Sequence, residues 1–155
     1  MFTHSMKLAA TVVLLSSLNL VTALAESCHV STGAVAFGAY DTASAGNLDA
    51  VGTLEIRCSS KVHVVLSLSV GNGVGANFSG GRKMTRVGGT GTLTYNLYAN
   101  AARTRVLGDD TGGSVTLRVN GKNNTTQTIW GRVANGQHVA ETGSYADSVV
   151  ASISY

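Results

Sequence analysis

The chain has 155 residues, of which 44% are apolar and 12% are charged, and its formal net charge is +3. A disordered chain needs low hydrophobicity and high net charge, and a coiled coil needs many Glu, Lys and Leu residues, so this composition excludes both. Basic residues outnumber acidic ones by only 11 to 8, without the clustering on one face that nucleic-acid binders usually show. We therefore expect one globular domain and no nucleic-acid partner.

The N-terminal segment, residues 1–25, predicts a secretory signal peptide. Lys7 precedes an apolar run over residues 8–25, which ends in the A-x-A pattern of Ala23, Leu24 and Ala25. The alternative is a transmembrane anchor, but the run contains several Ser, Asn and Thr residues and is short for a bilayer span of about 20 apolar residues. Cleavage after Ala25 leaves residues 26–155 as the mature domain, with no membrane span.

Two cysteines, Cys28 and Cys58, remain in the mature chain. In an exported protein, a small and even number of cysteines indicates a disulfide, which should stabilise the fold by roughly 3.5–4 kcal/mol. Two buried free thiols are the alternative. A metal pair is disfavoured because the chain has no CxxC or HxH motif and its histidines are scattered, so we expect no metal and no cofactor.

Most of the mature chain alternates apolar and polar residues with a period of two, which is typical of half-buried strands. The alternating or β-branched runs cover residues 51–58, 62–70, 92–99, 114–119, 125–133 and 149–155. Clusters of Gly, Asn, Asp and Ser separate them, and no stretch has a clear helical period. Short strands at such spacing predict an all-β sandwich of the immunoglobulin-like kind.

Tyr145 lies in the segment ETGSYAD, just before the last run. Immunoglobulin-like sandwiches often place a tyrosine there, with its hydroxyl bonded back to the backbone. The alternative is an ordinary tyrosine at the edge of the core. We predict that Tyr145 is a structural tyrosine of the first kind.

Motifs for catalysis are missing from the sequence. It has no G-x-S-x-G, no H-E-x-x-H and no phosphate-binding loop motif. The eight glycines of residues 71–91 precede a predicted strand, whereas a phosphate cradle needs a helix behind it. Asp109 and Asp110 are adjacent in GDDTGG, which favours a turn over paired acid–base chemistry. We therefore predict no catalytic residues and no enzyme activity.

Several segments, taken in order, resemble the spore coat protein U domain family, whose fold is used by archaic chaperone–usher pilins. They are VAFGAYD (35–41), DAVGT (49–53), Cys58, RKM (82–84), LTYNLYANAARTRVLGDDTGG (93–113), TGSYAD (142–147) and Tyr155. Together with Cys28, they span essentially all of residues 28–155.

The resemblance implies an immunoglobulin-like β-sandwich that lacks its final strand. Such a subunit exposes a groove, which a periplasmic chaperone fills first and a strand of another pilus subunit fills later, by donor-strand complementation at an outer-membrane usher. The implied function is that of a secreted structural subunit of a pilus or spore coat, supporting adhesion or biofilm formation. No residue follows Tyr155 to close the sheet, so we expect Val149, Ala151, Ile153 and Tyr155 to form the edge that binds the partner strand.

One departure from the family concerns the donor strand. Only Glu26 and Ser27 precede Cys28 in the expected mature chain, and two residues cannot form a strand of about five. The sequence thus predicts an acceptor without a donor strand, in a tip or accessory position. Alternatively, earlier cleavage would keep the alternating residues 18–24 as a donor strand.

A secreted carbohydrate-binding module is the alternative function. Modules of this kind usually expose aromatic side chains on one face. The aromatic residues available for such a face are Trp130, Tyr40, Tyr95 and Tyr98.

Overall fold

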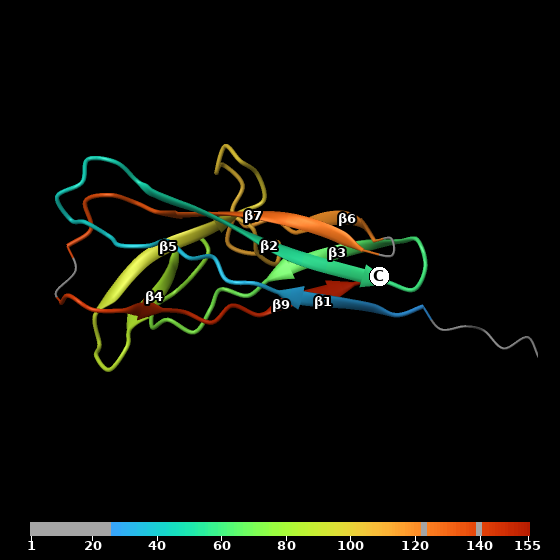
Figure 1. Cartoon of the computed structure of the whole chain (residues 1–155), viewed down its shortest axis with the longest axis horizontal. Coiled ribbons are helices and arrows are strands. Elements are labelled where there is room, and N and C mark those ends of the chain that lie inside the picture. The colour runs from blue at the N-terminus through green and yellow to red at the C-terminus, as the bar shows by residue number, and fades with distance from the viewer. Residues whose placement is uncertain (1–25, 122–123, 139–140) are drawn as a thin grey trace, which may run out of the picture.

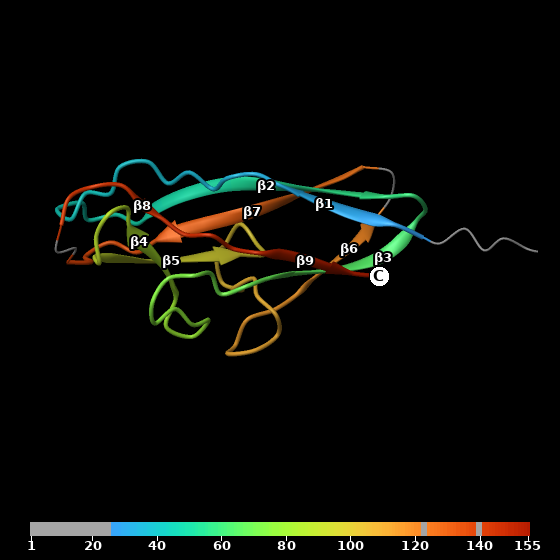
Figure 2. The same ribbon diagram turned by 90° about the horizontal axis from the view of Figure 1, so that it is seen from below.

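The computed structural model describes residues 26–121, 124–138 and 141–155, and these form a sandwich of two antiparallel sheets (Figures 1 and 2). The predicted signal peptide lies outside the described residues. The strands are β1 (Cys28–Thr32), β2 (Leu48–Cys58), β3 (Val62–Leu68), β4 (Arg82–Arg86), β5 (Thr92–Tyr98), β6 (Leu117–Gly121), β7 (Thr125–Val133), β8 (Tyr145–Ala146) and β9 (Ala151–Ser154). The larger sheet has the order β1-β2-β7-β5-β4-β8, and the smaller one has the order β6-β3-β9.

The predicted strands agree with the structure in the central part of the chain and differ at its edges. The runs 92–99 and 125–133 become β5 and β7, and the run 51–58 forms most of β2. β6 begins three residues later than predicted. Strands β1, β4 and β8 were not predicted, because they are short and β4 (RKMTR) has charged residues at three of five positions. The all-β class predicted from the sequence is confirmed.

The core lies between the two sheets, and the period of two decides which side chains enter it. On β2, Leu54 and Ile56 are buried, whereas Val51 on the opposite face is 55% exposed. On β3, Val64 and Leu66 are completely buried. A smaller cluster of buried residues surrounds Ile56 and Val64 at the β6 side, and the larger cluster extends along β5 and β7.

The two sheets are unequal in width, and this leaves part of the larger sheet without a facing strand. Six strands face three, and β9 pairs with β3 alone, with Ile153 opposite Leu66. β1 pairs with β2 alone and contacts β9 across the sandwich. In Figure 2 the larger sheet continues toward β4 and β8, beyond the end of β9. The inner face of β4 and β5 therefore lacks a complete partner layer.

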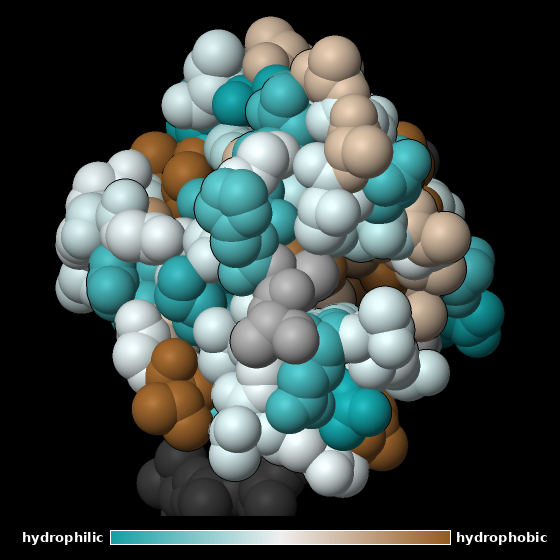
Figure 3. All heavy atoms as spheres, turned by 90° about the vertical axis from the view of Figure 1, so that its left-hand side faces the viewer, coloured by the Kyte–Doolittle hydropathy of each residue, from teal (hydrophilic) through white to brown (hydrophobic). Residues whose placement is uncertain are grey.

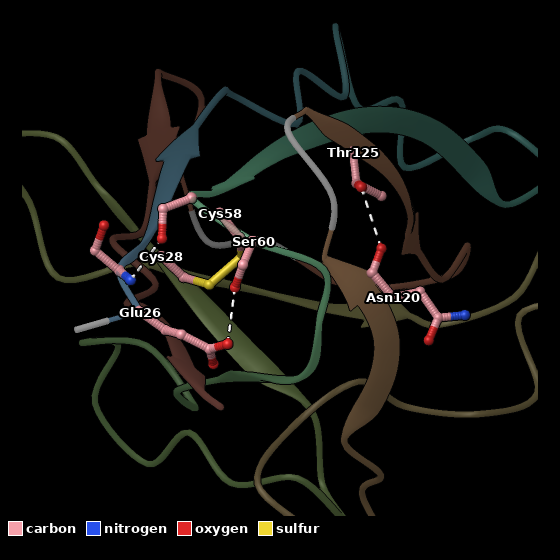
Figure 4. Close-up of a disulfide and its surroundings, with 8 residues drawn as sticks. Glu26, Cys28, Cys58, Ser60, Asn120 and Thr125 are labelled. Carbon is pink, nitrogen blue, oxygen red and sulfur yellow. Dashed lines mark hydrogen bonds between the residues drawn. A yellow bond between two sulfur atoms is a disulfide. The ribbon is translucent and has the colours of Figure 1, made fainter. Parts of the chain in front are cut away.

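The predicted disulfide joins Cys28 to Cys58, whose Cα atoms are 4.1 Å apart and whose strands pair directly at these residues. Figure 4 shows this end of the molecule, where the Ser60 hydroxyl donates a hydrogen bond of 2.8 Å to Glu26 Oε1. The amide of Ser59 also donates to the carbonyl oxygen of Ser27. These bonds continue the β1–β2 pairing past the disulfide. Across the described part of the chain, no helix has the length and apolar character that a membrane span requires.

Arg82 is a buried cation that the sequence analysis did not anticipate. Its side chain has no exposed surface and lies 5.1 Å from the centre of the Phe78 ring. It donates hydrogen bonds to the carbonyl oxygens of Ser69 and Leu107, so it joins the end of β3 to the loop after β5. Burial lowers the pKa of this guanidinium, and its Nη1 atom has no hydrogen-bond partner.

Candidate functional site

Two adjoining hollows lie over the inner face of the larger sheet, where no strand of the smaller sheet faces it. They have volumes of about 750 Å³ and about 300 Å³. Both are bounded by Val35 and Phe37 on one side, by Tyr145 on the other, and by Met84. Because they share these residues, we treat them as one feature, the inner groove, between residues 33–42 and residues 141–149.

The floor of the inner groove is apolar. Leu93 and Val133 lie beneath the larger hollow and Leu97 lies beneath the smaller one, and all three belong to the main core cluster. Met84, from β4, lines both hollows. The floor thus consists of core side chains that are themselves buried, and the wall segments rather than a facing strand cover them.

The first wall of the inner groove is the segment that follows β1. Val35 and Phe37 are half-buried and Ala34 and Ala36 are exposed, which is the alternation of a strand. However, residues 34–40 make no backbone-to-backbone hydrogen bond in the described structure. This wall thus presents peptide groups of the kind that a neighbouring strand would satisfy.

Two glycines in the larger sheet allow the first wall to lie close to it. A Cβ atom at Gly52 would come within 2.6 Å of Val35, and one at Gly131 would come within 2.7 Å of the Phe37 ring. Phe37 also packs edge-on against Tyr95, with ring centres 5.7 Å apart. Glycine inside a strand often marks such a close approach, and this signal was available in the sequence.

The second wall is the segment that leads into β9, and Asp147 holds it in place. Asp147 Oδ2 accepts a hydrogen bond of 2.8 Å from the Tyr95 hydroxyl, and Oδ1 accepts one of 2.8 Å from the amide of Asn72. Burial and the bond to Asp147 raise the pKa of Tyr95, so its hydroxyl keeps its proton and remains a donor. Residues 147–149 themselves make no backbone-to-backbone hydrogen bond in the described structure.

Tyr145 stands at the boundary of the two hollows, at the start of the second wall. Its hydroxyl donates a hydrogen bond of 2.7 Å to the carbonyl oxygen of Glu141, four residues upstream. That is the backbone contact expected for a structural tyrosine at this position. Arg86 holds the same turn by donating to the carbonyl oxygen of Thr142 and by an ion pair of 3.1 Å with Glu141.

The residues predicted to form the partner-binding edge lie at or beyond one end of the inner groove. Val149 lines the smaller hollow. Ala151 and Ile153 are half-buried on β9 and pack against the core, and Tyr155 is 56% exposed. The sequence analysis missed that the groove extends upstream, although Tyr145 and Asp147 continue the same alternation as Val149.

The four aromatic residues noted in the sequence separate into three environments. Tyr40 lines the inner groove, where its hydroxyl donates to the carbonyl oxygen of Ala134. Tyr95 is 6% exposed and belongs to the core. Trp130 and Tyr98 lie opposite each other on neighbouring strands β7 and β5, on the face of the larger sheet that points away from the core.

The adjacent carboxylates Asp109 and Asp110 lie in a turn in the described structure. Asp109 accepts hydrogen bonds from the amide and the hydroxyl of Thr111, which lower its pKa and form the predicted turn. Within residues 26–121, 124–138 and 141–155, no group of three or more His, Cys, Asp or Glu residues is placed to hold a metal ion.

The end of the sandwich formed by the loops at the left of Figure 1 differs from the inner groove. In the view of Figure 3, polar and neutral residues cover most of this end, and apolar residues lie in separate patches. This end therefore shows no continuous apolar surface in that view.

The comparison with known proteins assigns the family. The model of the Spore Coat Protein U domain matches residues 14–152. The chain belongs to the spore coat protein U domain family. It is 28% identical to Protein U of Myxococcus xanthus over 152 residues, covering 90% of this chain and 84% of that protein.

A solved structure with the same fold comes from the CsuC–CsuE chaperone–tip adhesion subunit pre-assembly complex of the archaic chaperone–usher Csu pili of Acinetobacter baumannii. The TM-score is 0.60 at 17% sequence identity, with 84% of this chain covered. The match spans 40% of that other chain, and it shows that the two proteins share a fold over this part. The family and the pilin-type fold expected from the sequence are both confirmed.

Proposed function

We propose that this member of the spore coat protein U domain family is a structural subunit of a secreted fibre or coat, and that its inner groove accepts a β-strand from a partner. The observation that carries the proposal is the groove itself. An apolar floor lies between two wall segments, residues 34–40 and 147–149, whose backbone groups lack backbone partners. A strand inserted between them would satisfy these groups and cover the floor.

The lining of the groove favours a strand over a small ligand. Small-molecule sites usually combine apolar walls with a few converging polar groups. Here the half-buried polar groups of the second wall are already engaged, since Asp147 bonds to Tyr95 and the Tyr145 hydroxyl bonds to Glu141. The remaining lining is backbone and apolar side chain, together with the exposed hydroxyl groups of Thr42, Thr142 and Ser144. Backbone and apolar side chain are the two features that β-strand addition uses.

The proposed partners follow from the family and the shared fold. They are a periplasmic chaperone, an outer-membrane usher and other subunits of the same fibre, with export through the periplasm to the cell surface or a spore coat. The matched complex joins a chaperone to a tip adhesion subunit, which supports a chaperone as the first occupant of the groove. The proposal includes support of adhesion or biofilm formation, and it assigns no catalytic role.

The position of the subunit in a fibre is a further part of the proposal. We assign it the acceptor role at the tip or as an accessory subunit. The intact mass of the exported protein tests this assignment, because it reports where the signal peptide is cut. A mass that retains residues 18–24 would contradict the acceptor-only assignment and favour a subunit with a donor strand.

The strand-acceptor function is tested by adding strands in trans. The exported chain is purified alone, with a strand-forming peptide of alternating apolar residues, and with a peptide of the same composition whose alternation is scrambled. We expect aggregation or a low melting temperature alone, and a clear rise only with the alternating peptide. A monodisperse, cooperatively melting protein that responds to neither peptide would overturn the proposal.

A further inference from the structure

The outer face of the larger sheet carries an aromatic row across three neighbouring strands. Val51 on β2 lies opposite Trp130 on β7, and Trp130 lies opposite Tyr98 on β5. Val51 is 55% exposed, and both aromatic side chains are partly exposed. These residues alternate with the inward-facing ones, so their side chains form a flat surface directly behind the core.

A charged row lies next to the aromatic row on the same face. The charged row consists of Asp49, Arg132 and Asn96. They lie two residues from Val51, Trp130 and Tyr98 along β2, β7 and β5. Arg132 donates from Nε and Nη2 to the two carboxylate oxygens of Asp49, at 2.7 and 2.8 Å. Arg103, from the loop after β5, also pairs with Asp49 at 3.3 Å, although its own φ of 54° is uncommon for a non-glycine residue.

The hydrogen bonding of this face leaves several polar groups unused. Within the described structure, Nη1 of Arg132, Nη2 of Arg103, the Tyr98 hydroxyl and the Trp130 indole N–H have no hydrogen-bond partner in the protein. Asn96 Oδ1 also lacks a partner, but it is buried and lies out of reach of a ligand on this face. Partly exposed aromatic rings beside free N–H and O–H donors are the combination that many ligand sites use, so their concentration around one aromatic row points to a ligand.

The charge of the face indicates which ligand fits. Two guanidinium groups, Arg103 and Arg132, surround one carboxylate, Asp49, which leaves one positive charge in excess. Both arginines pair with Asp49, and Arg103 also donates to the carbonyl oxygen of Gly131, the residue after Trp130. An anionic ligand with a flat apolar side would contact the ring and these donors together.

We propose that this face, made of Val51, Trp130, Tyr98, Arg132 and Arg103, binds an acidic polysaccharide. A uronic acid ring has a carbon–hydrogen side that stacks on Trp130 and Tyr98. Its carboxylate accepts hydrogen bonds from the guanidinium groups, and its hydroxyl groups bond to the indole N–H and the phenol.

The proposed glycan site is separate from the inner groove. Leu97 lines the groove from one side of β5, and its neighbours Asn96 and Tyr98 point to the other side. A strand in the groove therefore leaves the outer face accessible. A fibre built from such subunits would present one glycan site for each copy, and the site does not depend on the strand-acceptor function.

The test uses the exported full chain with Trp130 as reporter, since it is the only tryptophan in the sequence. The probes are hexagalacturonate, the neutral hexamer maltohexaose, and polyglutamate as an anion without a sugar ring. We expect a saturable change in tryptophan emission with hexagalacturonate alone. No change with hexagalacturonate, or an equal change with either of the other probes, overturns the proposal.

Variants are compared by electrophoresis in gels that contain polygalacturonate. Trp130→Ala should weaken binding by about tenfold or more, and Arg132→Gln should also weaken it, whereas Val74→Ala, at a residue 83% exposed on another loop, should bind normally. Thermal melting shows whether each variant is folded. If Trp130→Ala fails to fold, Tyr98→Phe replaces it as the test variant, because it removes only a hydroxyl group. The assignment is overturned if folded Trp130→Ala and Tyr98→Phe are both retarded as strongly as the unchanged protein. It is also overturned if the unchanged protein self-associates without glycan and these two variants do not.

Discussion

The inner groove predicts a sharp difference between two neighbouring valines. Val149 is half-buried and lines the smaller hollow, whereas Val150 is 63% exposed on the opposite side of the same segment. Val149→Asp and Val150→Asp make the same chemical change one residue apart. Only the first places a carboxylate inside the groove.

The expected size of the effect depends on whether the groove is filled. In the free protein the groove is open to water, so Val149→Asp loses about half of the burial of a valine, or about 1 kcal/mol of unfolding free energy. Asp147 lines the same hollow and adds repulsion of like charge. Once a strand covers the groove, an unpaired carboxylate costs several kcal/mol, and about 4 kcal/mol corresponds to about thousandfold weaker binding.

Two measurements separate folding from binding. Urea unfolding of the free protein should show a modest loss for Val149→Asp and almost none for Val150→Asp. Titration with a strand-forming peptide, or co-purification with the chaperone, should fail for Val149→Asp and succeed for Val150→Asp. If both variants bind equally well, or both lose binding equally, then the partner strand does not occupy this groove.

Three further predictions concern stability. Ile153 is half-buried and packs on both core clusters, so Ile153→Asp should lower the unfolding free energy measured in urea by about 3 kcal/mol. Ser152 is exposed, and Ser152→Asp should change the unfolding free energy by no more than about 0.5 kcal/mol. Equal losses in the two variants would contradict the strand register. Replacing Cys28 and Cys58 by serine should lower the unfolding free energy by roughly 3.5–4 kcal/mol. Alkylation of the protein without reductant should label no thiol, and two labelled thiols would refute the disulfide. The hydrogen bond from Arg132 and the charge of Arg103 lower the pKa of Asp49 from 3.8. Asp49 therefore stabilises the fold above pH 3.8 and loses this contribution as the pH falls below that value. In Asp49→Asn the unfolding free energy should fall less steeply with acidification, and an unchanged slope would contradict the ion pair.

The strands themselves were largely predictable because their signal is local. Alternation with a period of two depends only on neighbouring residues, and it identified β5 and β7 and the inward faces of β2 and β3. The pairing of Cys28 with Cys58 also followed from a countable feature, the presence of two cysteines. The matching segments, taken in order, were specific enough to predict the family before any fold was known.

The position of the groove was not predictable from the alternation of the last strand. The prediction chose Val149, Ala151, Ile153 and Tyr155, and the two hollows lie beside Val149 and the residues before it. Where a sandwich is left open depends on how many strands each sheet has, and that is a property of pairing between distant segments. Gly52 and Gly131 carried a signal, but it becomes interpretable only once Val35 and Phe37 are known to lie over them.

The sequence by itself determined the strand period, the disulfide, the absence of recognisable catalytic motifs and the membership of the family. Tertiary structure alone decided which faces meet. It buried Arg82 against two carbonyl oxygens, and it brought Val51, Tyr98 and Trp130 into one row from strands distant in sequence. The physical reason is that side-chain direction along a strand is set by the local backbone, whereas neighbours across strands are set by long-range hydrogen-bonded register.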